Sequence, residues 1–278
     1  ARVYQSQCTL ASTWNQDLAY KQGEFMGEDG LYLGKTSIWA PGANLHRTPY
    51  SARNFEYYSE DSMMAYWMGA RQCRGLQDKG CIACPKHYAF NDQEKNRCSL
   101  INFFNEQSGR ELQLRSFQGS FTIGGAMGTM TSFSRVGCTY AGASWSLLTG
   151  VLRGEWGFKG YTITDYAAWD FMHAIECLKA GTDMFDTTAD TYSSVILANV
   201  TKGDDPVAQA ALREANKRVL YAYVNSHAVE GTSIAVLPWW ESAIYTAIGI
   251  VAGLTAISLA AYVVFLVKGK KNNGGNAE

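Results

Sequence analysis

The sequence has no excess of charge of either sign. Its 24 lysines and arginines stand against 25 aspartates and glutamates, so the formal net charge is -1. No cluster of basic residues alternates with aromatic residues, as it does in many surfaces that bind nucleic acid. The composition therefore argues against a nucleic-acid partner.

The sequence also lacks a complete cysteine framework. Its seven cysteines are odd in number and scattered along the chain, whereas disulfide scaffolds use paired cysteines. Cys81 and Cys84 have the spacing of a redox or zinc motif, but no second pair stands at metal-ligand spacing. Both lie in an apolar stretch that runs into Pro85. We therefore expect ordinary core cysteines, and no metal site or cofactor.

The chain does contain enough apolar material for a full core. It has 278 residues, of which 47% are hydrophobic and 13% aromatic, so it is globular and comprises one domain or slightly more. Short strand patterns alternate with helical patterns, which is typical of α/β proteins with a parallel sheet. The expected strands are residues 36–40, 81–84, 126–133, 160–165 and 182–185. The expected helices are residues 10–30, 62–74, 105–117, 145–153, 167–180 and one that opens at Pro206.

Local signals support several of these elements. Thr13 or Asn15 can cap the first helix, and Asp61 can cap the helix that follows it. In that second helix Met63, Met64, Trp67 and Met68 recur at helical spacing, which predicts a face packed in the core.

The chain is organised around Asp165, the last residue of the strand predicted at residues 160–165. In a barrel of parallel strands, the carboxyl ends of the strands carry the chemistry. Charged and aromatic residues also follow the other predicted strands, which favours a barrel of the (β/α)8 type over an open sheet. The alternative for Asp165 alone is a cap on the helix predicted at residues 167–180.

Four motifs occur in order along the chain. They are Arg53-Asn54-Phe55-Glu56, Lys86-His87-Tyr88-Ala89-Phe90-Asn91-Asp92-Gln93-Glu94, Met130-Thr131-Ser132-Phe133 and Thr164-Asp165-Tyr166. Over residues 8–225 the combination resembles the barrel domain of family three glycoside hydrolases, the β-glucosidase group. The resemblance implies that Asp165 is the nucleophile of a retaining mechanism. It also implies that Arg53, Lys86 and His87 bind the sugar, and that Phe133 replaces a tyrosine of the family.

The residue types fit a retaining mechanism even without the family resemblance. A retaining glycosidase needs an ionised carboxylate at the anomeric carbon, and we expect Lys86, Arg53 and a protonated His87 to keep Asp165 anionic. Tyr166 and Phe133 would offer apolar faces to the sugar ring. The alternatives are a salt-bridged loop end for Lys86 and His87, and a pairing of Arg53 with Glu56 or Asp61.

Two parts of such an enzyme do not appear in the sequence. The family carries an Asp-Gly-Pro motif on its first strand, and nothing before Cys8 matches it. The resemblance also implies that the acid/base comes from an α/β sandwich domain. We therefore expect a TIM-like barrel incomplete at its N-terminal strand, with the sandwich domain upstream of Ala1. The Lys-His-Phe-Pro-Gly-His-Gly signature of the β-N-acetylglucosaminidase branch is absent, because the chain reads Lys86-His87-Tyr88-Ala89-Phe90-Asn91.

A long uncharged segment follows the barrel. Residues 243–267 are long enough to cross a bilayer at ~1.5 Å per residue. Trp239 and Trp240 precede the segment, and three lysines from Lys268 to Lys271 follow it. By the positive-inside rule, we expect a single-pass cell-membrane protein with its barrel extracytoplasmic and its C-terminus cytoplasmic. The expected divisions are residues 1–225 (barrel), 226–242 (linker), 243–267 (transmembrane helix) and 268–278 (tail).

The resulting hypothesis is an exo-acting, retaining, β-glucosidase-like hydrolase anchored in the lipid bilayer. Its substrates would be oligosaccharides or β-glucosides with terminal β-D-glucosyl or xylosyl residues. The alternative is a non-catalytic, membrane-anchored carbohydrate-binding or surface protein that keeps the barrel.

Overall fold

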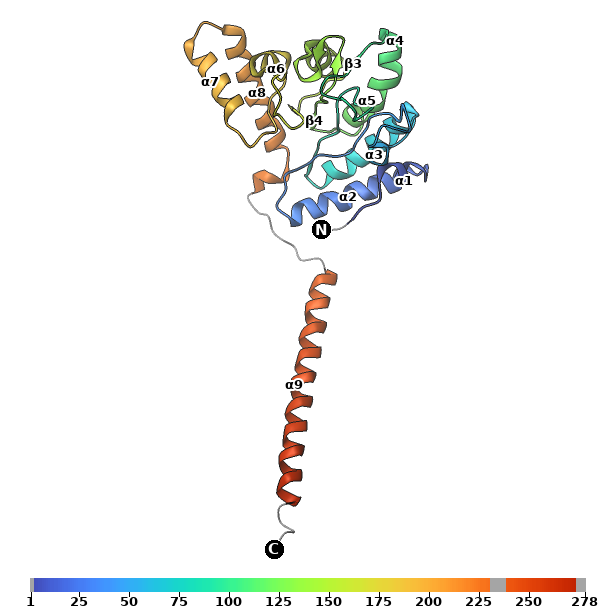
Figure 1. Ribbon diagram of the computed structural model, residues 1–278, viewed down its shortest axis with the longest axis vertical. Helices are drawn as coiled ribbons and strands as arrows, with labels where there is room; N and C mark the ends of the chain where they lie inside the picture. The colour runs from blue at the N-terminus through green and yellow to red at the C-terminus, as the bar shows by residue number, and fades with distance from the viewer. Residues whose placement is uncertain (1–2, 231–238, 274–278) are drawn as a thin grey trace. The chain divides into compact units, whose positions relative to one another are not determined.

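The structure, a computed structural model, describes residues 3–230 and 239–273 (Figure 1). The chain divides into two units, Ala1–Ile234 and Ala235–Glu278, and each is described by itself.

The helices and single helical turns, in chain order, are α1 (Gln7–Ala11), α2 (Gln16–Tyr32), η1 (Asn54–Glu56), α3 (Ser62–Asp78), α4 (Glu106–Ser108), η2 (Gly109–Leu114), α5 (Arg115–Thr122), η3 (Ala141–Ala143), η4 (Ser146–Glu155), α6 (Ala174–Ala180), α7 (Thr191–Lys202), α8 (Pro206–Val224), η5 (His227–Glu230) and α9 (Trp239–Asn273). The strands are β1 (Ser37–Ile38), β2 (Ile82–Ala83), β3 (Ile101–Asn102), β4 (Gly128–Met130), β5 (Arg135–Val136), β6 (Thr139–Tyr140) and β7 (Tyr161–Ile163).

Five short parallel segments lie beside one another in chain order. β1 pairs with β2 and β4 pairs with β7, both in parallel. Single parallel bridges join Tyr88 to Thr131, beyond β2 and β4, and Ile163 of β7 to Met184. A helical segment stands between each strand and the next, namely α3, η2 with α5, η4 and α6. The predicted alternation around a parallel sheet is therefore confirmed. A closed eight-stranded barrel is not confirmed, because residues 3–230 show only these five segments in the sheet.

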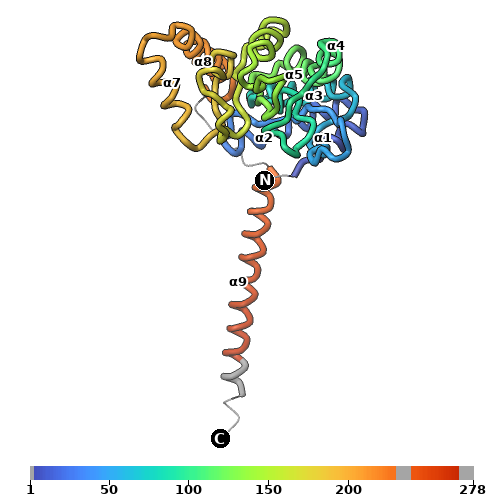
Figure 2. The backbone as a smooth tube through the Cα atoms, turned by 45° about the horizontal axis from the view of Figure 1, so that its top comes forward, coloured from blue at the N-terminus to red at the C-terminus, as the bar shows by residue number. Residues whose placement is uncertain are grey.

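Helix α3 packs closely against both α2 and α5, and α2 lies beside α3 in both views (Figures 1 and 2). Glycines allow this approach. A Cβ atom on Gly23 would stand 2.2 Å from the Gln72 carbonyl oxygen, and one on Gly75 would stand 2.2 Å from the Tyr20 carbonyl oxygen. A larger residue at either position would push the two helices apart.

This close packing overturns part of the expectation for the face of α3. Met68 is buried, but Met63 and Trp67 are exposed. The face of α3 in the core is formed instead by small residues such as Ala65 and Cys73. Small side chains suit a helix that touches two neighbours at short range, whereas the larger ones are displaced to the outside. The predicted caps are confirmed for Asn15 and Asp61, whose side chains accept hydrogen bonds from the amides of α2 and α3.

The expected helix over residues 167–180 is wrong in its first half. Residues 167–173 form a loop, and α6 begins at Ala174. The Ala167 amide donates to the Asp186 carbonyl oxygen at 2.6 Å, and Ala167 and Met172 are both buried. These tertiary contacts replace the hydrogen bonds of a helical turn. Helix α7 was not predicted.

The two cysteines at Cys-x-x-Cys spacing are core residues, as expected. Cys81 and Cys84 are buried and free. Burial raises the pKa of the Cys81 thiol to about 12, which disfavours the thiolate that metal binding or redox chemistry needs. Within residues 3–230 and 239–273, no group of three or more His, Cys, Asp or Glu residues could hold a metal ion.

The second unit contains one long apolar helix. Residues Trp239–Lys268 of α9 are long and apolar enough to cross a membrane, by length and composition alone. The helix continues through Asn273, so the tail expected from Lys268 begins as helix. Part of the expected linker, including Pro238, and the last residues of the tail, 274–278, lie outside the described residues.

A buried ion-pair cluster ties β7 to two helices of the first unit. The side chain of Asp183 is 0% exposed and pairs with Arg153 at 2.8 Å and with Arg218 at 2.7 Å. It also accepts a hydrogen bond from the Thr162 amide in β7. The cluster therefore joins η4, α8 and β7, the strand that precedes Asp165.

Removal of the carboxylate should be strongly destabilising. We expect Asp183→Ala to lower the free energy of unfolding by roughly 3–5 kcal/mol, because two arginines would be left without their buried partner. Urea unfolding of the first unit, followed by tryptophan fluorescence, measures the loss. The control is Asp17→Ala, whose carboxylate pairs with Arg71 but is 88% exposed and should change stability little. Equal effects of the two substitutions would contradict a structural role for the cluster.

Candidate active site

Loops that follow four strands meet around Asp165. Asp165 lies two residues beyond β7, Lys86 and His87 lie beyond β2, Phe133 lies beyond β4, and Arg53 lies in the loop after β1. The carboxyl ends of parallel strands meet at one edge of a sheet, which brings these distant positions together. The segment after β2 is anchored by Tyr88, which is buried and packs edge-on against Phe117 and Phe121 of α5.

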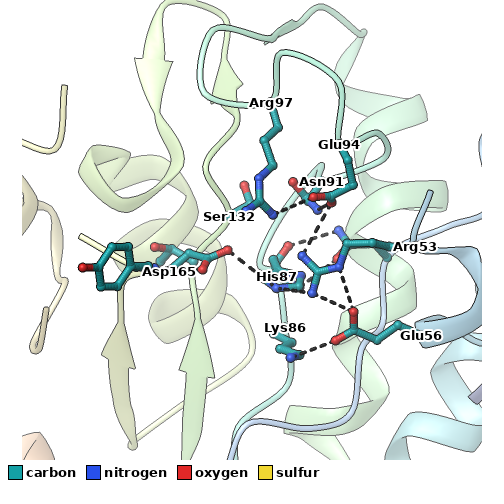
Figure 3. A network of polar contacts seen from close by, with 12 residues as sticks. Arg53, Glu56, Lys86, His87, Asn91, Glu94, Arg97, Ser132 and Asp165 are labelled. Atoms are coloured by element: carbon teal, nitrogen blue, oxygen red, sulfur yellow. Dashed lines mark hydrogen bonds and ion pairs between the residues drawn. The ribbon is translucent and has the colours of Figure 1, made fainter. Parts of the chain in front are cut away.

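Charged side chains form an alternating chain beside Asp165 (Figure 3). Lys86 Nζ lies 2.8 Å from Glu56 Oε1, and Arg53 lies 2.6 Å from the other oxygen of Glu56. Arg53 also faces Glu94 at 3.5 Å, and Glu94 pairs with Arg97 at 2.8 Å. Three cations thus share two glutamates. The pairing of Arg53 with Glu56 that was left open is present, whereas Asp61 instead caps α3.

The two glutamates are missing from the predicted site, although both stand in the motifs quoted for it. Burial alone would raise the pKa of Glu56, but Lys86 and Arg53 hold it below its usual value. Glu56 therefore stays ionised at neutral pH and fixes both cations. The signal in the sequence was the spacing from Arg53 to Glu56 and from Glu94 to Arg97, three residues in each case, which permits local ion pairs.

His87 is buried and neutral, which corrects the expectation of a protonated imidazole. Its side chain is 2% exposed. Burial, followed by the charges of Arg53, Lys86 and Arg97, lowers its pKa well below the usual value. Arg53 donates to Nε2 at 3.1 Å, and Nδ1 lies 3.3 Å from the hydroxyl of Tyr57. The proton of the neutral ring therefore belongs on Nδ1. Asn44 holds the backbone of His87 through two hydrogen bonds.

Asp165 faces this network with one oxygen that has no hydrogen-bond partner. Oδ1 accepts from the Tyr166 amide at 2.8 Å. Oδ2 is buried, lies 3.6 Å from His87 Nε2, and has no hydrogen bond among the described residues. Burial raises the pKa of Asp165, and the Tyr166 amide, Arg97, Arg53 and Lys86 oppose the rise. Asp165 does not cap α6, which begins nine residues later, at Ala174.

The two aromatic residues of the predicted site lie in different settings. Phe133 is only 2% exposed, and the guanidinium of Arg97 lies 4.3 Å from the centre of its ring. Phe133 thus supports Arg97 by a cation–π contact and does not present an open face. Tyr166 is 50% exposed and keeps a face that a ligand can reach.

Chemically, the arrangement offers a carboxylate with a free oxygen beside cations whose charges are already balanced. Such cations can donate hydrogen bonds to hydroxyl groups of a ligand without neutralising Asp165. The structure thus brings together Arg53, Lys86, His87 and Asp165, places Tyr166 next to them, and buries Phe133 under Arg97. Arg97, Glu56 and Glu94 join the set.

Comparison with known proteins identifies the family. The model of the glycosyl hydrolase family 3 N terminal domain matches residues 3–222. The chain is 36% identical over 175 residues to β-glucosidase A of Butyrivibrio fibrisolvens, which covers 63% of this chain and 21% of the relative. It is 34% identical over 184 residues to β-glucosidase B of Emericella nidulans, which covers 66% and 22%. The chain thus spans about a fifth of the length of these relatives.

Solved structures of β-glucosidases are also similar to this chain. The structure of β-glucosidase 3B from Thermotoga neapolitana in complex with glucose superposes with a TM-score of 0.80 at 31% identity, covering 86% of this chain and 34% of that one. A β-glucosidase of Bifidobacterium adolescentis superposes with a TM-score of 0.77 at 25% identity, covering 84% and 34%. The chain therefore belongs to glycoside hydrolase family 3 and contains that family's N-terminal domain.

Proposed function

We propose that the chain is the nucleophile-bearing part of a retaining β-glucosidase that removes terminal β-D-glucosyl or xylosyl residues. The observation that carries the proposal is the state of Asp165. Its Oδ2 has no hydrogen-bond partner among the described residues and lies beside donors that are held in place by two glutamates. The β-glucosidases among the relatives support the substrate class.

The reaction would run in two displacements. Asp165 Oδ2 attacks the anomeric carbon, and an ester bond forms as the bond to the leaving oxygen breaks. The electron pair goes to that oxygen, which takes a proton from an acid/base group. Water then attacks the same carbon, gives a proton to the acid/base and releases Asp165, so the sugar keeps its β configuration. Arg53 and Lys86 hold sugar hydroxyls, and the neutral His87 orients Arg53, which donates to its Nε2.

The acid/base is proposed to lie outside this chain. An acid must carry its proton at neutral pH, but the pKa of Glu56 is lowered, and Glu94 is paired with two arginines. We propose that an α/β sandwich domain upstream of Ala1 supplies it, in the order sandwich domain, barrel, membrane helix. The small share of the relatives that the chain covers supports a separate source for the acid. A longer reading frame without such a domain upstream would contradict this order.

Covalent labelling tests the nucleophile. A 2-deoxy-2-fluoro-β-glucoside with a dinitrophenolate leaving group needs no acid, so we expect a stable adduct on Asp165, located by peptide mass spectrometry. Asp165→Asn should abolish the adduct, whereas Asp17→Asn, at an exposed position, should keep it. Turnover of nitrophenyl β-glucoside by the 278-residue chain should be feeble. Reversible sugar binding without an adduct would favour the non-catalytic alternative, and vigorous turnover would place the acid within the chain.

The same carboxylate should weaken the fold. Because burial raises the pKa of Asp165 above its unfolded value, the folded state binds the proton more tightly. Stability therefore falls as the pH rises through the interval between the two values. We expect Asp165→Asn, which keeps the acceptor for the Tyr166 amide, to unfold at a higher temperature than the wild type at pH 7. The difference should disappear at a pH below both pKa values. If Asp165→Asn were less stable than the wild type at pH 7, the prediction would be wrong, because the nearby cations would then outweigh the cost of burying the Asp165 charge.

We also propose that α9 anchors the protein in the cell membrane, with the first unit extracytoplasmic and the C-terminus cytoplasmic. The support is the length and apolar character of Trp239–Lys268 and the lysines Lys268, Lys270 and Lys271 that end it. The full chain should float with lipid vesicles in a density gradient and resist extraction by high salt. A chain ending at residue 230 should stay at the bottom. Release of the full chain by salt would contradict the anchor.

A further inference from the structure

The last helical turn of the first unit, η5, is held at the edge of the sheet opposite to Asp165. Asp165 lies beyond the carboxyl end of β7, whereas Gly80 lies two residues before β2, where the parallel strands begin. The His227 amide of η5 donates to the Gly80 carbonyl oxygen at 2.9 Å. The contact is close, because a Cβ atom on Gly80 would stand 3.0 Å from the Cβ atom of His227. The edge where the strands begin, the amino edge, therefore carries η5.

Four loops form the amino edge, and none of them contains an acidic residue. They enter β1, β2, β4 and β7 and comprise residues 33–36, 79–81, 123–127 and 156–160. Leu33 is 53% exposed and Ile123 is 44% exposed. Lys35 and Lys159 are exposed as well. The amino edge thus presents apolar side chains among lysines.

The end of α8 and η5 extend this surface. Ala215 and Ala222 are the buried side of α8, whereas Val224 is 58% exposed and Val229, in η5, is 53% exposed. Exposed apolar side chains that gather on one surface mark a site of interaction. Apolar side chains interspersed with lysines are typical of surfaces that lie at a lipid interface, where the lysines meet anionic headgroups.

The length of the connecting chain favours a bilayer as the partner. Residues 231–238, eight in number, separate Glu230 at the end of η5 from Trp239 at the start of α9. From Glu230 to Trp239 such a chain spans at most about 30 Å, even when fully extended. When α9 crosses a membrane, as proposed above, η5 cannot move farther than this from the headgroups. The tether keeps the local concentration of lipid at the amino edge high.

We propose that the amino edge rests on the bilayer surface. Leu33, Ile123 and Val229 would enter the interfacial layer, while Lys35 and Lys159 would contact anionic headgroups. The inference rests on the proposed membrane anchor. The opposite edge, with Asp165, then opens away from the membrane. The enzyme would accordingly act on glycosides in solution and not on the sugar headgroups of lipids in the same bilayer.

Photo-crosslinking of the full chain in vesicles of phosphatidylcholine and phosphatidylglycerol tests the contact. We expect Ile123→p-benzoylphenylalanine and, at a second position, Leu33→p-benzoylphenylalanine to form lipid adducts that mass spectrometry detects. The matched control is Tyr50→p-benzoylphenylalanine, because Tyr50 is 89% exposed but lies in the loop after β1, at the carboxyl edge. It should form no lipid adduct.

Charge reversal tests the role of the lysines. Lys35→Glu combined with Lys159→Glu should lower the yield of lipid adduct at position 123 by ~5-fold or more, because a lysine near an anionic surface contributes about 1 kcal/mol. Lys95→Glu is the control, since Lys95 is exposed in the loop after β2, and it should leave the yield unchanged.

The outcomes separate this contact from the anchor. If the chain floats with vesicles but positions 33 and 123 form no lipid adduct, or no more than position 50, the contact is overturned and the anchor stands. Adducts to a second copy of the chain in place of lipid would assign the amino edge to a protein interface and overturn the lipid assignment. If the chain does not float, the anchor fails, and the contact fails with it.

Discussion

The site depends on keeping one buried carboxylate charged without giving it a strong ion pair. Asp165 lies close enough to Arg97, Arg53 and Lys86 for their charges to oppose the effect of burial on its pKa. However, the ion pairs of these cations run to Glu56 and Glu94. A direct salt bridge would lower the pKa of Asp165 and also occupy Oδ2, the oxygen that attacks in the proposed mechanism. Because Glu56 and Glu94 pair with the cations, Asp165 Oδ2 stays without an ion-pair partner.

This balance explains the side chains that surround the site. Glu56 orients Lys86 and Arg53 together, while Glu94 fixes Arg97. Phe133 contributes by stacking beneath Arg97, and its role is therefore to position a cation. Burial and the same field of positive charge lower the pKa of His87, since a fourth positive charge inside the cluster would be desolvated and repelled. The imidazole consequently serves as a fixed acceptor and not as another counter-ion for Asp165.

The sequence predicted that the loops after several strands would meet at Asp165, because the carboxyl ends of parallel strands lie at one edge of a sheet. The residues after β2, β4 and β7 had to meet once those strands were parallel. It did not predict the loop of residues 167–173, which has a helical pattern but is held by the hydrogen bond from Ala167 to Asp186. Nor did helical spacing predict that α3 would bury Ala65 and expose Met63. Periodicity defines a face, whereas the distance to neighbouring helices decides which side chains fit there.

In the proposed mechanism, the charge distribution also determines which role the described side chains can take. A nucleophile needs an ionised carboxylate, and the cations near Asp165 oppose the rise of its pKa that burial causes. A proton donor needs the opposite environment, one that favours the neutral acid or the protonated imidazole. The cations that help Asp165 lower the pKa values of Glu56 and His87. The proposed function accordingly assigns the proton donor to a group outside the field of these three cations.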